Sequence, residues 1–148
     1  DFPDWQLVIA GRLGWLYSQV LKEARNSPYA ADIIFLGGVE SEERVSLYNS
    51  ARVFVYPSFF EGFGFPPLEA QASGCPVIVA NRTSLPEVLG DSALYVDPWK
   101  AGDLADQIRR LAGDARLRSE LVARGIENAK KFDWRDSAAA TIKLFHSQ

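Results

Sequence analysis

Two glutamates flank a glycine-containing turn in the middle of the chain. Glu61 comes directly before Gly62 and Gly64, and Glu69 lies within a predicted helix that starts near Pro66. Proline suits the first turn of a helix, because its φ is already helical and its missing N–H would have had no partner there. The spacing therefore predicts one carboxylate on each side of a helix amino terminus.

The backbone of this turn offers a place for an anion. Glycine lets a ligand approach the bare main chain, and unpaired N–H groups with about half a positive charge point out of a helix amino terminus. Carboxylates accept hydrogen bonds from the hydroxyls of a sugar or a ribose. A ligand with phosphate in its middle and polyols at both ends, such as a nucleotide sugar, matches this pattern. Each glutamate taken alone also fits a solvated helix face, since Glu is favoured near a helix start.

The elements that must position these groups can be read from apolar runs and cap residues. Apolar runs predict strands at residues 5–11, 33–39, 53–56, 76–80 and 93–96. Helical spacing predicts helices between them, one capped by Ser41 and one with capping-box spacing from Ser84 to Glu87. Further helices follow, the last of them capped by Asp133. This alternation predicts an α/β fold, a Rossmann-like doubly wound parallel sheet, in one domain over residues 1–148.

Composition narrows the class of protein. The chain has 148 residues, 47% of them hydrophobic and 24% charged, which suits one globular core. Its net charge of −3 gives no hint of the basic face that nucleic acid binding would require, so we expect no nucleic acid partner. The lone Cys75 makes no internal disulfide, fits a reducing compartment, and is expected to be a small buried residue rather than a nucleophile.

Around the two glutamates the chain resembles the retaining glycosyltransferase family 4, whose members have the two-domain GT-B fold. The pattern Pro-Ser-x-x-Glu-Gly-Phe-Gly-x-Pro-x-Leu-Glu-Ala stands at residues 57–70. It continues as Ala-Ser-Gly-Cys-Pro-Val-Ile at 72–78, Pro-Glu-Val at 86–88 and Val-Asp-Pro at 96–98. Several spaced elements agree, so the signal is specific. The resemblance covers nearly the whole chain, but only the carboxy-terminal half of the family's usual length.

The resemblance implies a role for each residue of the motif. Glu61 is the catalytic candidate and is expected to hold hydroxyls of the transferred sugar, without acting as a covalent nucleophile. Glu69 is expected to accept the ribose hydroxyls of the donor. Backbone groups of the turn and the first helical turn are expected to meet the sugar and phosphates, which adds the donor-binding residues Gly62, Phe63, Gly64, Phe65 and Leu68.

Two further residues are donor-binding candidates with ordinary alternatives. Val39 corresponds to the family's base-contacting loop, although a valine at a strand end is also a usual core residue. Arg12 follows a strand and is placed to reach a phosphate, although it also fits a solvated surface arginine.

The implied reaction is transfer of a hexose from a nucleotide diphosphate sugar to a glycan or lipid-linked acceptor, with retention and without a metal. The general base and acceptor site would lie in an amino-terminal domain outside this sequence. Residues 11–17 look similar to bacterial mannosyltransferases, which favours GDP-mannose over UDP-sugars. We expect a cytoplasmic protein, with peripheral association at the inner face of the membrane as an open alternative.

The resemblance also predicts a gap in the sheet. Members of the family open this domain with another strand, central in the order 3-2-1-4-5-6, followed by an Arg and a Lys for the diphosphate. Neither that strand nor that pair lies upstream of Trp5, and the first residue is not Met. We therefore expect a fragment whose open sheet edge is covered by another chain or leads to oligomers.

Two other functions remain open. A dinucleotide-dependent oxidoreductase is disfavoured, because Gly62 and Gly64 are followed by Phe65-Pro66-Pro67 and not by the third glycine of that fingerprint. A nucleotide or sugar binding module without turnover is the alternative that the sequence leaves in place, and comparison of the parent enzyme with this chain would separate the two.

Overall fold

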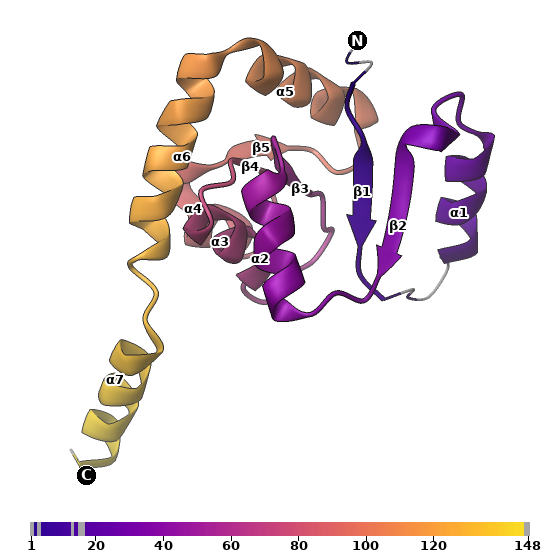
Figure 1. Cartoon of the computed structure of the whole chain (residues 1–148). Coiled ribbons are helices and arrows are strands. Elements are labelled where there is room, and N and C mark those ends of the chain that lie inside the picture. Colours follow the sequence, from indigo (N-terminus) through magenta and orange to yellow (C-terminus); the bar gives the residue numbers. More distant parts are fainter. Residues whose placement is uncertain (1, 3, 13, 15–16, 147–148) are drawn as a thin grey trace. The chain divides into compact units, whose positions relative to one another are not determined.

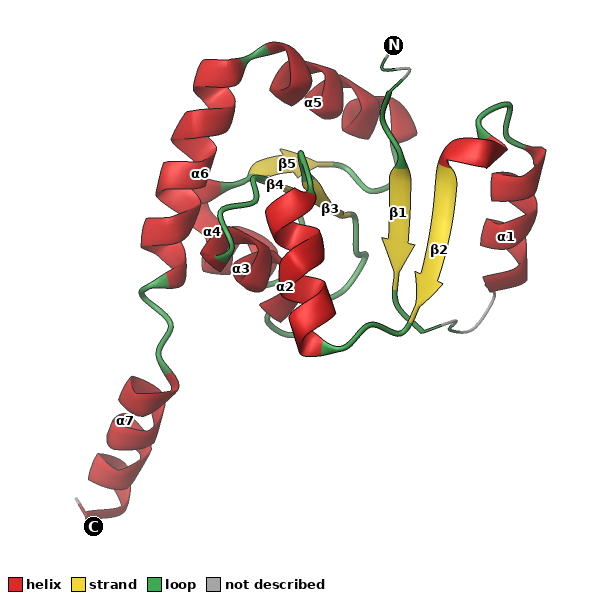
Figure 2. Cartoon of the chain, in the orientation of Figure 1, coloured by secondary structure: helices red, strands yellow, loops and turns green. Residues whose placement is uncertain are grey.

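A computed structural model of the chain describes residues 2, 4–12, 14 and 17–146. By its internal contacts the chain divides into two compact units, Asp1–Arg44 and Val45–Gln148. Figure 2 shows that each unit contains both strands and helices. Each unit is described by itself.

The first unit is a single strand–helix–strand segment. Strand β1 (Leu7–Ala10) leads to helix α1 (Tyr17–Asn26), a short 3-10 turn (Ala30–Asp32) and strand β2 (Ile33–Gly37), which pairs parallel with β1. The ladder extends to the Gly11 N–H, which donates to the Gly37 carbonyl at 2.7 Å. No described residue of α1 is buried, so one helix and two strands leave much apolar surface open.

The second unit contains a three-stranded parallel sheet. Strands β3 (Phe54–Tyr56), β4 (Val77–Ala80) and β5 (Leu94–Val96) pair in the order β3-β4-β5. Figure 1 labels the helices that lie before, between and after these strands in the sequence. They are α2 (Ser41–Ser50, which begins in the first unit), α3 (Phe65–Ala72), α4 (Leu85–Leu89), α5 (Ala101–Gly113), α6 (Ala115–Ala129) and α7 (Trp134–His146), with a 3-10 turn at Gly90–Ser92.

Strand β4 is buried on both faces, and its alternating side chains define two cores. Val77 and Val79 belong to one cluster, with buried side chains of α2, α3 and α4. Ile78, between them in sequence, belongs to a second cluster with Leu111 of α5 and Leu121 of α6. Because side chains alternate between the two faces of a strand, helices cover both faces of the sheet. The predicted doubly wound α/β fold is therefore confirmed.

The strands fall into two sheets, β1-β2 and β3-β4-β5. A sheet with the strand order 3-2-1-4-5-6 would have this pairing if its first strand were absent. Strands 2 and 3 would pair with each other, and strands 4, 5 and 6 would form a second sheet. We propose that residues 1–148 form one domain when the sheet is complete.

Two predicted helix caps are wrong in detail. Helix α2 begins at Ser41 itself, and the backbone N–H of Glu40 is satisfied by the Glu43 carboxylate at 2.9 Å. Ser84 precedes α4 but makes no cap hydrogen bond with its side chain. Its hydroxyl is used by another loop, described below. At the last helix the prediction is confirmed, because the Asp133 carboxylate accepts the Arg135 N–H at 2.8 Å.

Cys75 is buried at 2% exposure, as predicted, and burial raises the pKa of its thiol to about 11. At pH 8 roughly 0.1% of such a thiol is the reactive thiolate. We therefore expect negligible reaction with Ellman's reagent in the native chain and complete reaction of this single thiol in guanidinium chloride. Fast reaction of the native chain at the rate of free cysteine would contradict this.

Candidate functional site

The candidate site is built on the loop between β3 and α3. The loop ends at Gly64, which has φ 110° and is buried. A Cβ added to Gly64 would lie 2.7 Å from Cδ2 of the buried Leu85, so both the backbone conformation and the available space require glycine here. Gly62 differs from Gly64, because its φ is not positive and no atom lies within 4 Å of an added Cβ.

Helix α3 begins at Phe65, one residue before the predicted start. The two residues that follow, Pro66 and Pro67, have no N–H. The N–H groups available at this helix end are therefore those of Gly64 and Phe65. The N–H of Leu68 is at the fourth helical position, where a regular helix uses it for the Gly64 carbonyl.

The Glu61 side chain is half-buried and held by a tyrosine. The Tyr56 hydroxyl donates a hydrogen bond of 2.6 Å to Oε1 of Glu61. Burial raises the pKa of Tyr56, and its hydrogen bond to Glu61 and the negative charge of Glu61 raise it further. Tyr56 therefore stays a hydrogen-bond donor, which suits an ionised carboxylate as its partner.

The backbone of Glu61 is held by the loop after β4. Its N–H donates to Oγ1 of Thr83 at 3.1 Å. The Ser84 hydroxyl lies 3.0 Å from the Glu61 carbonyl and 2.9 Å from the Phe63 carbonyl, and its single proton is shared between them. Thr83 has φ 51°, which is rare and costly for a β-branched residue. Both loops follow parallel neighbouring strands, so they meet at the carboxyl edge of the sheet.

Sequence reasoning missed Tyr56, Thr83 and Ser84 as parts of this site. The signal for Thr83 and Ser84 was their place directly after a strand that neighbours β3. Ser84 was assigned to a cap because its spacing to Glu87 matches a capping box. The structure uses its hydroxyl to close the β3–α3 loop instead.

Glu69 lies in the same helix that starts at this loop and is half-buried. The position of that helix is set by a buried polar network. Gln71 Nε2 donates to the Ser92 carbonyl at 3.0 Å and to Ser92 Oγ at 2.7 Å, and Gln71 Oε1 accepts from Asn128 Nδ2 of α6 at 3.1 Å. An added Cβ on Gly125 of α6 would lie 3.0 Å from Cγ of Gln71, so α6 packs closely against α3.

The predicted site residues are divided between the two units. Glu61, Gly62, Phe63, Gly64, Phe65, Leu68 and Glu69 lie together at the β3–α3 junction. Arg12 and Val39 follow β1 and β2 in the first unit. The Arg12 side chain runs over Gly38, with its Cγ 3.4 Å from an added Cβ there. Adjacent parallel strands thus bring these two loops to one edge. Arg12 is exposed and Val39 is half-buried.

Exposed aromatic rings border the β3–α3 loop. The rings of Phe59 and Trp99 are 4.4 Å apart, and Trp99, in the loop after β5, is 73% exposed. On the helix side, Phe65 stacks with Trp134 at 5.7 Å. Trp134, the first residue of α7, makes this ring contact while remaining 75% exposed.

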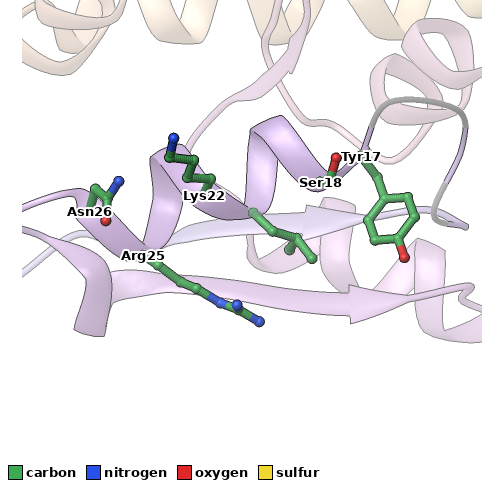
Figure 3. Close-up of a pocket in the computed structure, with 6 residues that line it drawn as sticks. Tyr17, Ser18, Lys22, Arg25 and Asn26 are labelled. Atoms are coloured by element: carbon green, nitrogen blue, oxygen red, sulfur yellow. The ribbon is translucent and has the colours of Figure 1, made fainter.

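A hollow of about 200 Å³ lies elsewhere, along α1 in the first unit. Figure 3 shows its labelled lining residues, Tyr17, Ser18, Lys22, Arg25 and Asn26, on one helix. None of the predicted site residues lines it. Among the described residues, no group of three or more His, Cys, Asp or Glu is placed to hold a metal ion. The described helices are too short or too polar to cross a membrane.

Comparison with known proteins identifies the family. Residues 1–132 match the profile of the glycosyl transferases group 1. The chain is 38% identical over 141 residues to an O-antigen chain mannosyltransferase B of Escherichia coli, covering 95% of this chain and 37% of that protein. It is 32% identical over 147 residues to a D-inositol 3-phosphate glycosyltransferase of Arthrobacter sp. (strain FB24), covering 97% of this chain and 35% of that protein.

A solved structure agrees with this relationship. A sucrose-phosphate synthase from Thermosynechococcus elongatus superposes with a TM-score of 0.88 and 26% identity, over 98% of this chain and 39% of that one. The chain therefore spans little more than a third of the length of these relatives. Since the family profile covers most of its residues, this chain belongs to the group 1 glycosyl transferases, which have the GT-B fold.

Proposed function

We propose that this chain is the donor-binding half of a retaining hexosyltransferase, and we call the longer polypeptide that would contain it the parent protein. The observation that carries this proposal is the β3–α3 junction. There a held carboxylate, Glu61, precedes a helix end whose Gly64 and Phe65 N–H groups are available to an anion. Membership of the group 1 glycosyl transferases supports a transferase whose donor carries both an anionic group and sugar hydroxyls.

In this proposal each end of the donor has its own partner. Glu61 takes hydroxyls of the transferred sugar, and Glu69 takes the ribose hydroxyls. The helix end, with the N–H groups of Gly64 and Phe65, stabilises charge that develops on the departing diphosphate. Phe63 and Gly62 complete the turn, and Leu68 contributes less than predicted because a regular helix uses its N–H. Arg12 and Val39 would serve the phosphate and the base from their own loops.

We propose GDP-mannose as the preferred donor. Residues 11–17, part of which lies outside the described residues, resemble bacterial mannosyltransferases. Several relatives of the chain are also named as mannosyltransferases. The acceptor would be a glycan or a lipid-linked glycan bound through the amino-terminal domain, with no metal required. We place the parent protein in the cytoplasm, with the inner face of the membrane as a site of peripheral association. The open edges of β1 and β3 would be paired in the parent or in an oligomer.

Ligand-dependent stabilisation of the chain tests the donor site. A ligand at 100 times its Kd stabilises the folded state by about 2.7 kcal/mol, so GDP and GDP-mannose should raise the Tm measurably. Glu69→Ala should abolish this rise, because the ribose loses its acceptor. Glu127→Ala, which removes an exposed carboxylate on α6 paired with Lys130, is the matched control and should leave the rise intact.

Two outcomes would redirect the proposal. A larger stabilisation by NAD than by nucleotide diphosphates would favour the oxidoreductase alternative. Donor binding by the parent protein without transfer of the hexose to any acceptor glycan would favour a binding module without turnover. The transfer assay is therefore run on the parent protein beside this chain.

A further inference from the structure

The Glu61 carboxylate is held by a side chain of the protein itself. Its Oε1 accepts the Tyr56 hydroxyl at 2.6 Å, and the contact is partly buried. Among the described residues, Tyr56 is the one side chain that hydrogen-bonds this carboxylate. Oε1 is therefore already occupied by one strong donor, while Oε2 remains for a ligand hydroxyl.

The tyrosine is itself fixed by the core. Its ring stacks on Phe54 at 5.9 Å, and Phe54 meets Tyr48 of α2 edge to face at 5.1 Å. Phe54 and Tyr56 are two residues apart on β3, so they share one face of the sheet. This row of three rings connects the buried cluster to the hydroxyl that holds Glu61.

The main chain of Glu61 is fixed independently. Thr83 accepts its N–H at 3.1 Å while adopting φ 51°, a conformation that a β-branched residue holds only when its surroundings demand it. Ser84 holds the Glu61 carbonyl at 3.0 Å. Side chain and main chain of one residue are thus restrained by groups from two different elements.

We propose that Tyr56 and Thr83 are positioning residues that fix Glu61 for the sugar end of the donor. This inference rests on the proposed function, in which Glu61 meets the transferred sugar and Glu69 meets the ribose. A restrained acceptor loses little entropy on binding and is aimed at one hydroxyl position. The restraint should matter for the sugar and not for the nucleotide, because neither residue hydrogen-bonds α3, which carries Glu69.

The test compares two ligands of the parent protein, the nucleotide sugar and the nucleoside diphosphate. For Tyr56→Phe we expect kcat/KM for the nucleotide sugar to fall roughly 10- to 100-fold, since a small misplacement of a positioned group costs that much. The Kd of the nucleoside diphosphate, which lacks the sugar, should stay within about twofold of wild type. Tyr95→Phe is the matched control, because it removes a hydroxyl that donates to the Gly90 carbonyl over the same 2.6 Å and should change neither value.

Substitutions at Thr83 give a second test, in which a conservative variant should restore the lost function. Thr83→Val keeps the branched shape but removes the acceptor of the Glu61 N–H, and it should weaken use of the nucleotide sugar in the same selective way. Thr83→Ser keeps the acceptor oxygen and should restore most of it. Equal losses for both ligands in Tyr56→Phe and Thr83→Val, or no loss for either, would overturn the proposal.

A ligand-free measurement separates this inference from the proposed function. Crystal structures of wild type and Tyr56→Phe without ligand should show one Glu61 rotamer in the first and a displaced or multiple carboxylate in the second. An unchanged Glu61 in the variant would refute positioning by Tyr56. Failure of wild type to bind any nucleotide would instead refute the donor site, while the rotamer comparison still decides what holds Glu61.

Discussion

Replacing Gly64 by alanine is expected to destabilise the second unit by about 2–5 kcal/mol and to abolish stabilisation by nucleotide diphosphates. Alanine at a positive φ costs about 1–2 kcal/mol, and an extra methyl group in a packed core costs about 1–3 kcal/mol. Both costs apply here, because φ is 110° and the added Cβ would lie 2.7 Å from Leu85. Leu85 is 0% exposed, so its side chain cannot relieve the contact by turning out into solvent.

The loss of binding follows from the same atoms. The Gly64 N–H is one of two donors at the start of α3, and any shift that relieves the clash moves that donor and the loop from Glu61 onwards. Thermal unfolding followed by circular dichroism, with and without GDP, measures both effects.

Gly62→Ala is the matched control for this prediction. It adds the same methyl group two residues earlier, where φ is not positive and no atom lies within 4 Å. We expect its Tm to remain near wild type. If Gly64→Ala were as stable as Gly62→Ala, the packing described for the loop would be wrong.

Replacing Gln71 by leucine is expected to lower the free energy of unfolding by about 2–4 kcal/mol. The side chain is 1% exposed, and its hydrogen bonds go to Ser92 and Asn128. Leucine has a similar volume but leaves the Ser92 carbonyl and one Asn128 N–H buried without this partner, and each such group costs about 1–3 kcal/mol. For a domain of this size we expect Tm to fall by roughly 10 °C.

Gln107→Leu should have the opposite sign. Among the described residues, Gln107 Oε1 is a buried side-chain oxygen without a hydrogen-bond partner. The same substitution there removes an unsatisfied polar atom, so we expect unchanged or increased stability. Chemical denaturation of both variants beside wild type makes the comparison, and equal destabilisation by the two would show that the Gln71 network contributes nothing special.

These two predictions concern the two ends of one helix. Gly64 sets where α3 begins, and Gln71 fixes its far end against α6 through Asn128. Glu69 lies between them on that helix. Its position therefore depends on packing at both ends of α3, so substitutions at Gly64 and at Gln71 are both expected to affect the donor site.

Local patterns in the sequence were sufficient for the elements and for the presence of the candidate site. The apolar run of β4, the prolines at the start of α3 and the carboxylate of Asp133 act on neighbours within a few residues, so their effect is visible in one dimension. The glycines and prolines of residues 57–70 likewise predicted the turn and the helix start at the β3–α3 junction.

Only the tertiary structure decided which groups hold that junction. The Ser84 hydroxyl had a local use as a helix cap and a distant use at the Glu61 and Phe63 carbonyls, and the distant one prevails. Tyr56, Thr83 and Gln71 act across turns or between strands and helices, and sequence spacing does not encode such contacts. They depend on how the chain packs at the carboxyl edge of the sheet, because hydrogen bonds form between groups that folding brings within about 3 Å, whatever their separation along the chain.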